Sequence, residues 1–198
     1  MARPRKTTIR GVWWKNIVAE VRHCARCGTR LVRRYVREEK RKRHVCPRCR
    51  RITYVNPKVV AGLIPVLPDG RVLLLKRNIE PGFGRWSYPA GYQELGESVL
   101  TAARRETWEE VGVKVTSVRF LGIYSYKDAG VVTVVYVGKL SRTAKPRPSS
   151  EALISDFFEW KKVPWKELAF RSTREALKDY RRSLSFLKSA PKHGKQLP

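Results

Sequence analysis

Three glutamates near the middle of the chain could hold a metal ion. Glu106, Glu109 and Glu110 are spaced so that, on a helix, their carboxylates lie on one face. Carboxylates crowded on one face repel one another unless a positive charge lies between them, and a hard cation such as Mg²⁺ binds carboxylate oxygens together with substrate phosphates. The alternative is an ordinary solvated face in which Arg105 pairs with Glu109. We favour the metal site, because this otherwise basic chain concentrates its acids here.

The residues around these glutamates predict a loop followed by a helix. Two glycines within residues 91–97 predict a compact loop at the start of the helix. Ser98 can cap a helix that runs from about residue 99 to residue 111, and Gly112 can end it. The face opposite the glutamates would pack on the core, and it consists of Leu100, Ala103, Thr107 and Val111.

Four cysteines form a second group of residues that could bind a metal ion. They make two Cys-x-x-Cys pairs with eighteen residues between the pairs: Cys24, Cys27, Cys46 and Cys49. This spacing is typical of two knuckles that close on one tetrahedral Zn²⁺. A redox role is the weaker alternative, because catalytic Cys-x-x-Cys motifs do not normally occur in two copies at this interval. We expect the zinc to stabilise a module too small to form its own core.

Basic residues are concentrated at both ends of this 198-residue chain, whose formal net charge is +26. Residues 1–58 contain 19 Lys and Arg against 3 acids, residues 171–198 contain 8 against 2, and residues 59–170 contain 16 against 12. Such an excess suits a polyanion-binding surface, for which nucleic acid is the natural partner. Solvated charge that maintains solubility is the alternative, but solubility needs far less charge than this.

The length allows one ordinary domain and one small module. No apolar run approaches the roughly 20 residues of a membrane helix, so we expect no membrane span. Paired cysteines without a secretory signal predict a reducing compartment, either the cytoplasm or an organellar matrix such as that of mitochondria.

Short apolar runs separated by turn residues predict strands at 59–67, 71–77, 115–126, 131–140 and 157–160. Helical patterns follow at 164–170 and 173–187. Strands mixed with helices predict an α/β layered domain. We therefore divide the chain into a basic arm at 1–22 that contains Trp13 and Trp14, a zinc ribbon at 23–55, a main domain at 56–170, and a C-terminal helix with a basic tail at 171–198.

The segment from Gly91 to Val113 resembles the complete signature of the Nudix hydrolase family. Gly91 is followed after five residues by Glu97, and after seven more by the run from Arg105 to Val113. Thr107 stands where the family usually has a bulky aliphatic residue. Residues 86–90 resemble the strand that precedes this signature, and the cysteine module resembles the zinc ribbon found ahead of some members.

This resemblance implies a fold, a reaction and a set of roles. The fold would be an α/β/α sandwich around a mixed sheet, and the reaction would be hydrolysis of a nucleoside diphosphate linked to another moiety. Mg²⁺ or Mn²⁺ would be bound by carboxylates and one carbonyl, namely Glu106, Glu109, Glu110 and the carbonyl of Gly91. Glu97 would support this cluster, and Arg105 would orient a carboxylate.

The general base and the substrate are less closely defined. Glu151 is our candidate for the base or a fourth acidic ligand, with an exposed loop acid as the alternative, and Asp128 is a weaker substitute. The closest resemblance is to zinc-ribbon Nudix proteins that act on ADP-ribose, FAD or similar dinucleotides, although Ala129 lies where the ADP-ribose subgroup would have proline. The alternative is an RNA-associated Nudix protein that acts on RNA 5′ ends or serves as a non-catalytic component of an (organellar) ribosome or of its assembly machinery. Substrate identity and oligomeric state stay open at this point.

Overall fold

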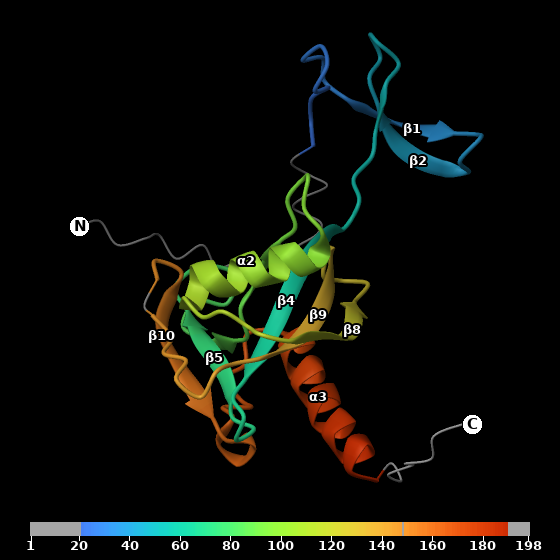
Figure 1. Cartoon of the computed structure of the whole chain (residues 1–198). Coiled ribbons are helices and arrows are strands. Elements are labelled where there is room, and N and C mark those ends of the chain that lie inside the picture. The colour runs from blue at the N-terminus through green and yellow to red at the C-terminus, as the bar shows by residue number, and fades with distance from the viewer. Residues whose placement is uncertain (1–20, 148, 190–198) are drawn as a thin grey trace, which may run out of the picture. The chain divides into compact units, whose positions relative to one another are not determined.

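The computed structural model describes residues 21–147 and 149–189 of the chain, with side chains described as far as Leu184 (Figure 1). The basic arm with Trp13 and Trp14, and the tail after residue 189, lie outside the described residues. The chain divides into two compact units. We call them the ribbon unit, with described residues 21–58 and 126–131, and the sandwich unit, with described residues 59–125, 132–147 and 149–189.

The ribbon unit contains a small antiparallel sheet in the order β1-β2-β3. Its strands are β1 (Val32–Val36), β2 (Arg41–Val45) and β3 (Ile52–Thr53). The buried hydrophobic residues at its centre are two cysteines and Leu31. A core this small offers little apolar burial, which agrees with the expectation that a metal must stabilise the unit.

The sandwich unit is built on a larger sheet with the main strand order β10-β5-β4-β9-β8. These strands are β4 (Lys58–Val66), β5 (Val72–Arg77), β8 (Val118–Ser125), β9 (Val131–Lys139) and β10 (Ala152–Phe158). Two short strands add to it: β6 (Trp86–Ser87) pairs with β5, and β7 (Ala90–Tyr92) pairs with β4.

The sheet is mixed, as the sequence predicted. At one end of the β4–β9 pair the backbone N–H of Lys58 donates to the carbonyl of Gly130, and at the other end Leu140 donates to Val66. These two bonds show that β4 and β9 run parallel, whereas β5 is antiparallel to both β4 and β10. The mixed sheet of the predicted α/β sandwich is therefore confirmed.

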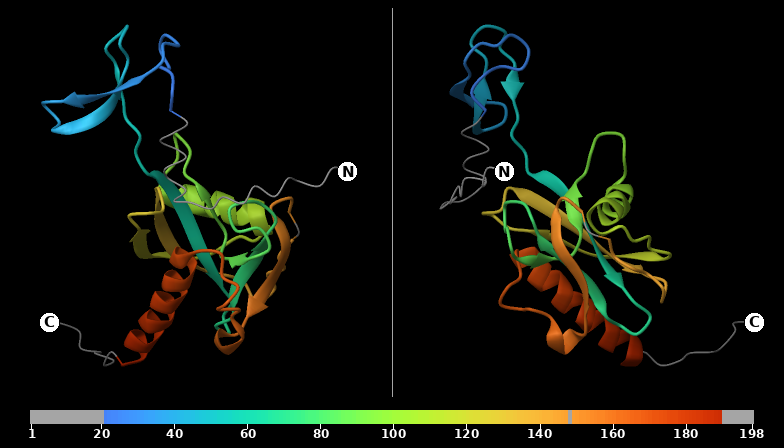
Figure 2. Two further views of the ribbon diagram at one scale, coloured as in Figure 1. Left: turned by 180° about the vertical axis from the view of Figure 1, so that it is seen from behind. Right: turned by 90° about the vertical axis from the view of Figure 1, so that its left-hand side faces the viewer.

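Two helices cover opposite faces of this sheet (Figure 2). Helix α2 (Val99–Val111) packs Ala102 and Ala103 against Leu63 of β4. On the other face, helix α3 (Arg171–Ser189) lies against β8, where the hydroxyl of Tyr124 donates to Asp179 Oδ2 at 2.9 Å. The sheet thus holds α2 firmly on one side while its own far side is covered by α3.

Most predicted elements are present, but one prediction was wrong. Residues 164–170 form turns rather than a helix. The backbone N–H of Trp86 donates to Glu167, and that of Ala169 donates to Trp86, so this segment satisfies its hydrogen bonds against β6 instead of within itself. The strand predicted at 157–160 begins earlier, at Ala152, and a short 3₁₀ helix (Trp160–Lys162) follows it.

Candidate active site

Helix α2 has the predicted boundaries, and its end residues explain why. The side-chain oxygen of Ser98 accepts a hydrogen bond from the backbone N–H of Thr101 at 3.1 Å. Gly112 ends the helix in the left-handed conformation, with φ of 65°. Thr107 is fully buried, and its hydroxyl donates to the carbonyl of Ala103 at 2.7 Å, so a polar residue fits at this core position. The helix is therefore a rigid platform for its acidic face.

Arg105, in the middle of α2, binds three carboxylates. Its guanidinium donates to four groups: Glu97 Oε1 at 2.7 Å, Glu106 Oε1 at 2.7 Å, Glu109 Oε2 at 2.9 Å and the carbonyl of Tyr92 at 3.0 Å. Glu97 also accepts from the backbone N–H of Glu94 at 2.9 Å, which fixes the loop before the helix. The bond from Arg105 holds the pKa of Glu97 below its usual value. One cation thus positions acids from both the loop and the helix.

Glu110 lies below this cluster and is almost fully buried, with 3% of its surface exposed. One carboxylate oxygen accepts from the backbone N–H of Ala90 at 2.8 Å. Burial raises the pKa of Glu110 to about 8, because a carboxylate loses its hydration there. Burial also raises the pKa of the half-buried Glu106. Burial therefore disfavours the ionised form of both carboxyl groups in the metal-free protein.

Gly91 leaves space that the carboxylate of Glu106 fills. Gly91 lies in β7, opposite Ala61 of β4. A Cβ atom at position 91 would overlap the carboxylate carbon and both oxygens of Glu106. Glycine at this position therefore lets the Glu106 carboxylate lie directly against the strand.

Glu151 is exposed, but it acts electrostatically on the buried acids. Its negative charge raises the pKa of both Glu106 and Glu110. Its backbone carbonyl accepts from the N–H of Asn78 at 2.8 Å, which ties the loop before β10 to the end of β5. Asp128 lies in the β8–β9 turn, which belongs to the ribbon unit rather than to the unit that carries the glutamates.

Arg77 is a site residue that the sequence analysis missed. It is 7% exposed, its Nε donates to the carbonyl of Pro81 at 2.9 Å, and its guanidinium lies 5.1 Å from the ring centroid of Phe170. Burial lowers its pKa, and the charges of Glu110 and Glu151 oppose this effect. The alternation of β5 could have indicated it, since Arg77 shares a strand face with the buried Leu75.

The four cysteines converge as their spacing predicted. The Sγ atoms of Cys24 and Cys49 are 3.6 Å apart, those of Cys27 and Cys46 are 3.5 Å apart, and all four lie within 4.8 Å of one another. These distances fit a tetrahedral site with Zn–S bonds of about 2.3 Å. Among the described residues this is the one group of three or more His, Cys, Asp or Glu with ligand atoms so close together.

Comparison with known proteins identifies the family of both parts of the chain. A model described as the NUDIX domain matches residues 56–184, and a model described as Nudix N-terminal, a zinc ribbon, matches residues 22–55. The chain belongs to the Nudix hydrolase family, in the group whose members carry an N-terminal zinc ribbon.

Two of the relatives bear on the choice of substrate. The NAD-capped RNA hydrolase NudC of Chromobacterium violaceum is 38% identical over 50% of this chain, but the chain covers only 35% of that protein. This chain thus spans about a third of the length of that relative. The ADP-ribose pyrophosphatase of Methanocaldococcus jannaschii is 32% identical over 65% of this chain and 76% of its own length.

A solved structure supports the fold over most of the chain. A Nudix hydrolase from Nitrosomonas europaea is 34% identical, has a TM-score of 0.76, and covers 83% of this chain and 93% of its own. Within the described residues, no helix is long and apolar enough to cross a membrane. The comparisons give no support to a ribosomal role.

Proposed function

We propose that this protein hydrolyses the pyrophosphate bond of a nucleoside diphosphate linked to another moiety, in a reaction that depends on Mg²⁺ or Mn²⁺. The carboxylates of Glu97, Glu106 and Glu109 bonded to Arg105, together with the buried Glu110 on the same helix, carry this proposal. Carboxylate oxygens are the donors that a hard divalent cation prefers. Burial raises the pKa of Glu106 and Glu110, so their ionised forms need a nearby positive charge, which such a cation would supply.

The cation would be held by oxygens from one helix and one strand: the carboxylates of Glu106, Glu109 and Glu110, and the carbonyl of Gly91. When bound, it would lower the pKa of the attacking water and neutralise charge on the departing phosphate. Glu110 would have to be ionised to act as a ligand, and its bond from the Ala90 N–H holds one oxygen in place. A Cβ atom on Gly91 would overlap the carboxylate of Glu106, so β7 and this proposed ligand lie in direct contact.

Arg105 and Glu97 would act as positioning residues. Arg105 touches the carboxylates of Glu106 and Glu109, and Glu97 in turn fixes the guanidinium through two bonds of 2.7 and 3.2 Å. Such outer partners hold ligands in orientations that a metal site requires. A side chain that kept only the charge of Arg105 would lose this geometry.

Glu151 would accept the proton of the attacking water. The oxygen of that water forms the new bond to phosphorus while the bond between phosphorus and the bridging oxygen breaks, and the leaving phosphate departs with the bond electrons. Two features support this role: the exposure of Glu151 to solvent, and its electrostatic influence on Glu106 and Glu110. Asp128 is the weaker alternative to Glu151 for this role.

ADP-ribose and related dinucleotides are the substrates that we propose first. The ADP-ribose pyrophosphatase relative is matched over 76% of its length, which is the broader of the two named resemblances. NAD-capped RNA is the second candidate, because it offers the same kind of bond and because residues 21–58 contain fourteen Lys and Arg against two acids.

A substrate panel tests this proposal. The purified zinc-loaded chain is incubated with Mg²⁺ or Mn²⁺ and with ADP-ribose, FAD, NADH or NAD-capped RNA, and the products are identified by mass spectrometry. We expect AMP, or a 5′-monophosphate RNA end, together with a phosphorylated partner. Hydrolysis of none of the four compounds at any metal concentration would contradict the proposal.

A further inference from the structure

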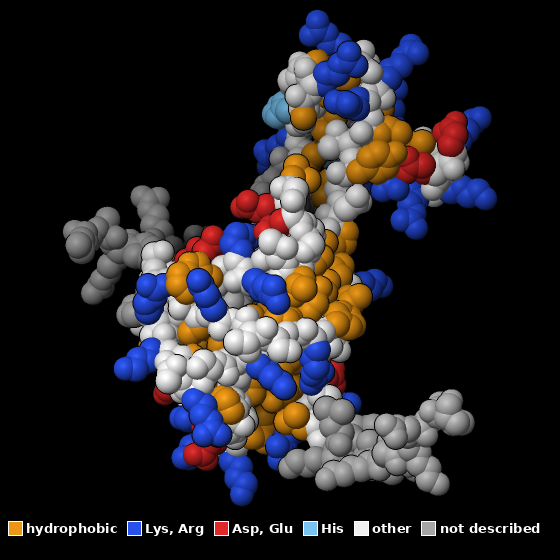
Figure 3. All heavy atoms as spheres, viewed as in Figure 1, with side chains coloured by type: hydrophobic (Ala, Val, Ile, Leu, Met, Phe, Trp, Pro, Cys, Tyr) orange, Lys and Arg blue, Asp and Glu red, His pale blue; other side chains and the backbone are white. Residues whose placement is uncertain are grey.

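The ribbon unit carries far more positive charge than a zinc site needs. Residues 21–58 contain fourteen Lys and Arg, whereas the acids among them are Glu38 and Glu39. Many Lys and Arg side chains project from the face of this unit that is seen in the space-filling view (Figure 3). Glu39 is already engaged by Arg43, with 2.6 Å between Oε2 and Nε. The unit is therefore a concentrated cationic surface, which attracts polyanions.

The two faces of the β1–β2 hairpin differ in their aromatic content. Pairing of Tyr35 with Lys42, and of Arg33 with His44, places these four side chains on one face, because residues directly opposite each other in a sheet point to the same side. We call this the tyrosine face. The ring of Tyr35 is 58% exposed there.

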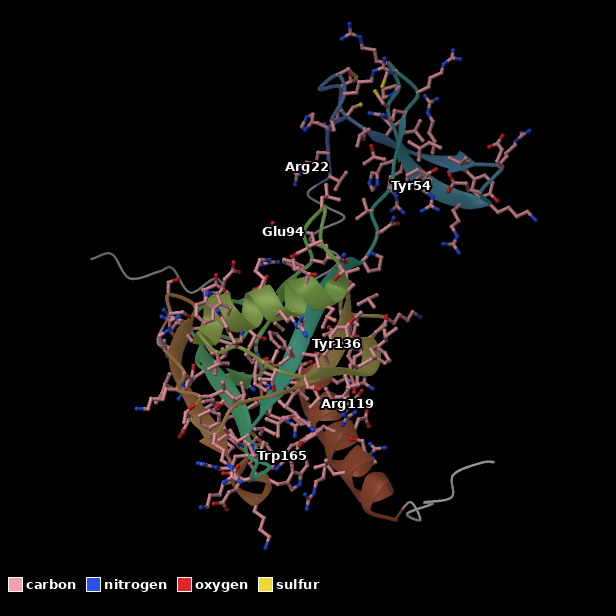
Figure 4. The ribbon with its side chains drawn as sticks, viewed as in Figure 1. Arg22, Tyr54, Glu94, Arg119, Tyr136 and Trp165 are labelled. Atoms are coloured by element: carbon pink, nitrogen blue, oxygen red, sulfur yellow. The ribbon has the colours of Figure 1, made fainter. Side chains whose placement is uncertain are left out.

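On the other face, the aromatic residue is Tyr54, and its side chain contacts residues of the ribbon unit itself. Tyr54, labelled in Figure 4, donates its hydroxyl to Glu39 Oε1 at 2.7 Å, and Arg43 lies 5.2 Å from the centroid of its ring. The valines of β1 and β2 also lie on that side, with Val36 and Val45 partly buried. Tyr35 has no comparable hydrogen bond or cation–π contact among the described residues, so its exposed ring can contact a ligand.

An exposed aromatic ring between two cations suits one kind of ligand best. Bases of single-stranded nucleic acid stack on such rings while their phosphates contact neighbouring Lys and Arg. An acidic peptide would match the charge but offers no flat base for Tyr35. A membrane surface would need an apolar tip, and the hairpin turn instead consists of Arg37, Glu38, Glu39 and Lys40.

We propose that the tyrosine face binds single-stranded nucleic acid, with Tyr35 stacked on a base and with Arg33 and Lys42 in contact with phosphates. This inference does not depend on the hydrolase activity, because the residues belong to the ribbon unit alone. Stacking and phosphate contacts do not require a 2′-hydroxyl. DNA and RNA single strands are therefore expected to bind with affinities within a few-fold of each other.

The test is fluorescence anisotropy with a labelled 20-nucleotide oligo(A), using the full zinc-loaded chain at several salt concentrations. Tyr35→Ala should weaken binding by about 10-fold or more with little change in the salt slope. Tyr35→Phe should retain most of the affinity. Arg33→Ala and Lys42→Ala should each reduce the slope of log K against log[salt] by about 0.7. Arg34→Ala removes the same charge from the opposite face and should have a smaller effect.

Several outcomes would overturn the proposal. It fails if Tyr35→Ala binds as tightly as the unchanged chain while its zinc content and circular dichroism are normal. It also fails if a duplex of the same length, or poly-glutamate of equal charge, competes as well as oligo(A). Absence of binding at 50 mM salt would contradict it as well. Activity of Tyr35→Ala on a small dinucleotide provides an independent readout of the sandwich unit.

Discussion

The carboxylate of Glu106 occupies the position that a side chain at residue 91 would need. A Cβ atom on Gly91 would overlap the carboxylate carbon and both oxygens of Glu106. Gly91 has no left-handed backbone conformation, so its role comes from the position of the Glu106 carboxylate and not from backbone strain. Glycine here leaves room for this proposed metal ligand against β7.

The change Gly91→Ala should displace Glu106 and reduce kcat by about 100-fold or more, because metal ligands tolerate little misplacement. It should also lower the free energy of unfolding by about 1–3 kcal/mol through overpacking. In a Glu106→Ala background the same change should cost much less stability, since the clash is gone. An equal cost in both backgrounds, measured by urea unfolding, would show that Glu106 is not the obstacle.

Replacement of Arg105 by lysine should weaken the site although the charge is kept. Lysine cannot reach Glu97, Glu106 and the Tyr92 carbonyl from one planar group, as Arg105 does. We expect the apparent affinity for Mg²⁺ or Mn²⁺ and the value of kcat to fall by about 10- to 100-fold. Arg104→Lys, at an exposed neighbouring position of α2, is the matched control. If both variants behave alike, Arg105 has no special positioning role.

Glu110 should make the stability of the Mg²⁺-free protein depend on pH. Its pKa is about 8 in the folded chain, against 4.5 as the ordinary value. Between these values the folded state holds a proton that the unfolded state has lost. Glu110 therefore lowers the free energy of unfolding progressively as the pH rises from about 4.5 to 8.

The variant Glu110→Gln should remove this dependence and be more stable than the unchanged chain at pH 8. The difference should be on the order of a few kcal/mol, since each pKa unit corresponds to about 1.4 kcal/mol. Thermal unfolding of the zinc-loaded protein without Mg²⁺, at pH 5 and pH 8, measures it. Identical pH profiles for the two proteins would show that Glu110 titrates normally.

Glu151→Gln tests the proposed base. The loss of a general base should reduce kcat by about 100-fold or more while leaving the affinity for substrate nearly unchanged. Glu159→Gln is the matched control, because Glu159 is an exposed acid at the other end of β10. We expect that control to change kcat by less than about two-fold. Full activity of the Glu151→Gln variant would show that Glu151 is not the general base.

The acidic helix could be predicted from sequence because its signals are local. Ser98, Gly112 and the spacing of the glutamates act within a few turns, so the boundaries of α2 and its acidic face followed directly. The four cysteines likewise define a zinc site by spacing alone. In both cases the residues that matter are close in the sequence or recur in a strict pattern.

The contacts between distant segments could not be predicted in the same way. Arg77 becomes a buried partner of the acids only because β5 ends beside the loop that carries Glu151. The segment 164–170 has a helical pattern, but its backbone bonds to Trp86, far away in the sequence. Such long-range pairing overrides local preference, which is why the helix predicted there was wrong.

The turnover of the Glu109→Gln variant tests most directly whether the α2 glutamates form the catalytic metal site. Glu109 is 54% exposed in its side chain and bonds to Arg105 at 2.9 Å, so the amide should preserve the fold while it removes a proposed metal ligand. On the best substrate of the panel, with saturating Mg²⁺ or Mn²⁺, we predict a fall in kcat of about 1,000-fold with unchanged thermal stability. Activity within ten-fold of the unchanged chain would contradict the assignment of the α2 glutamates as the catalytic metal site.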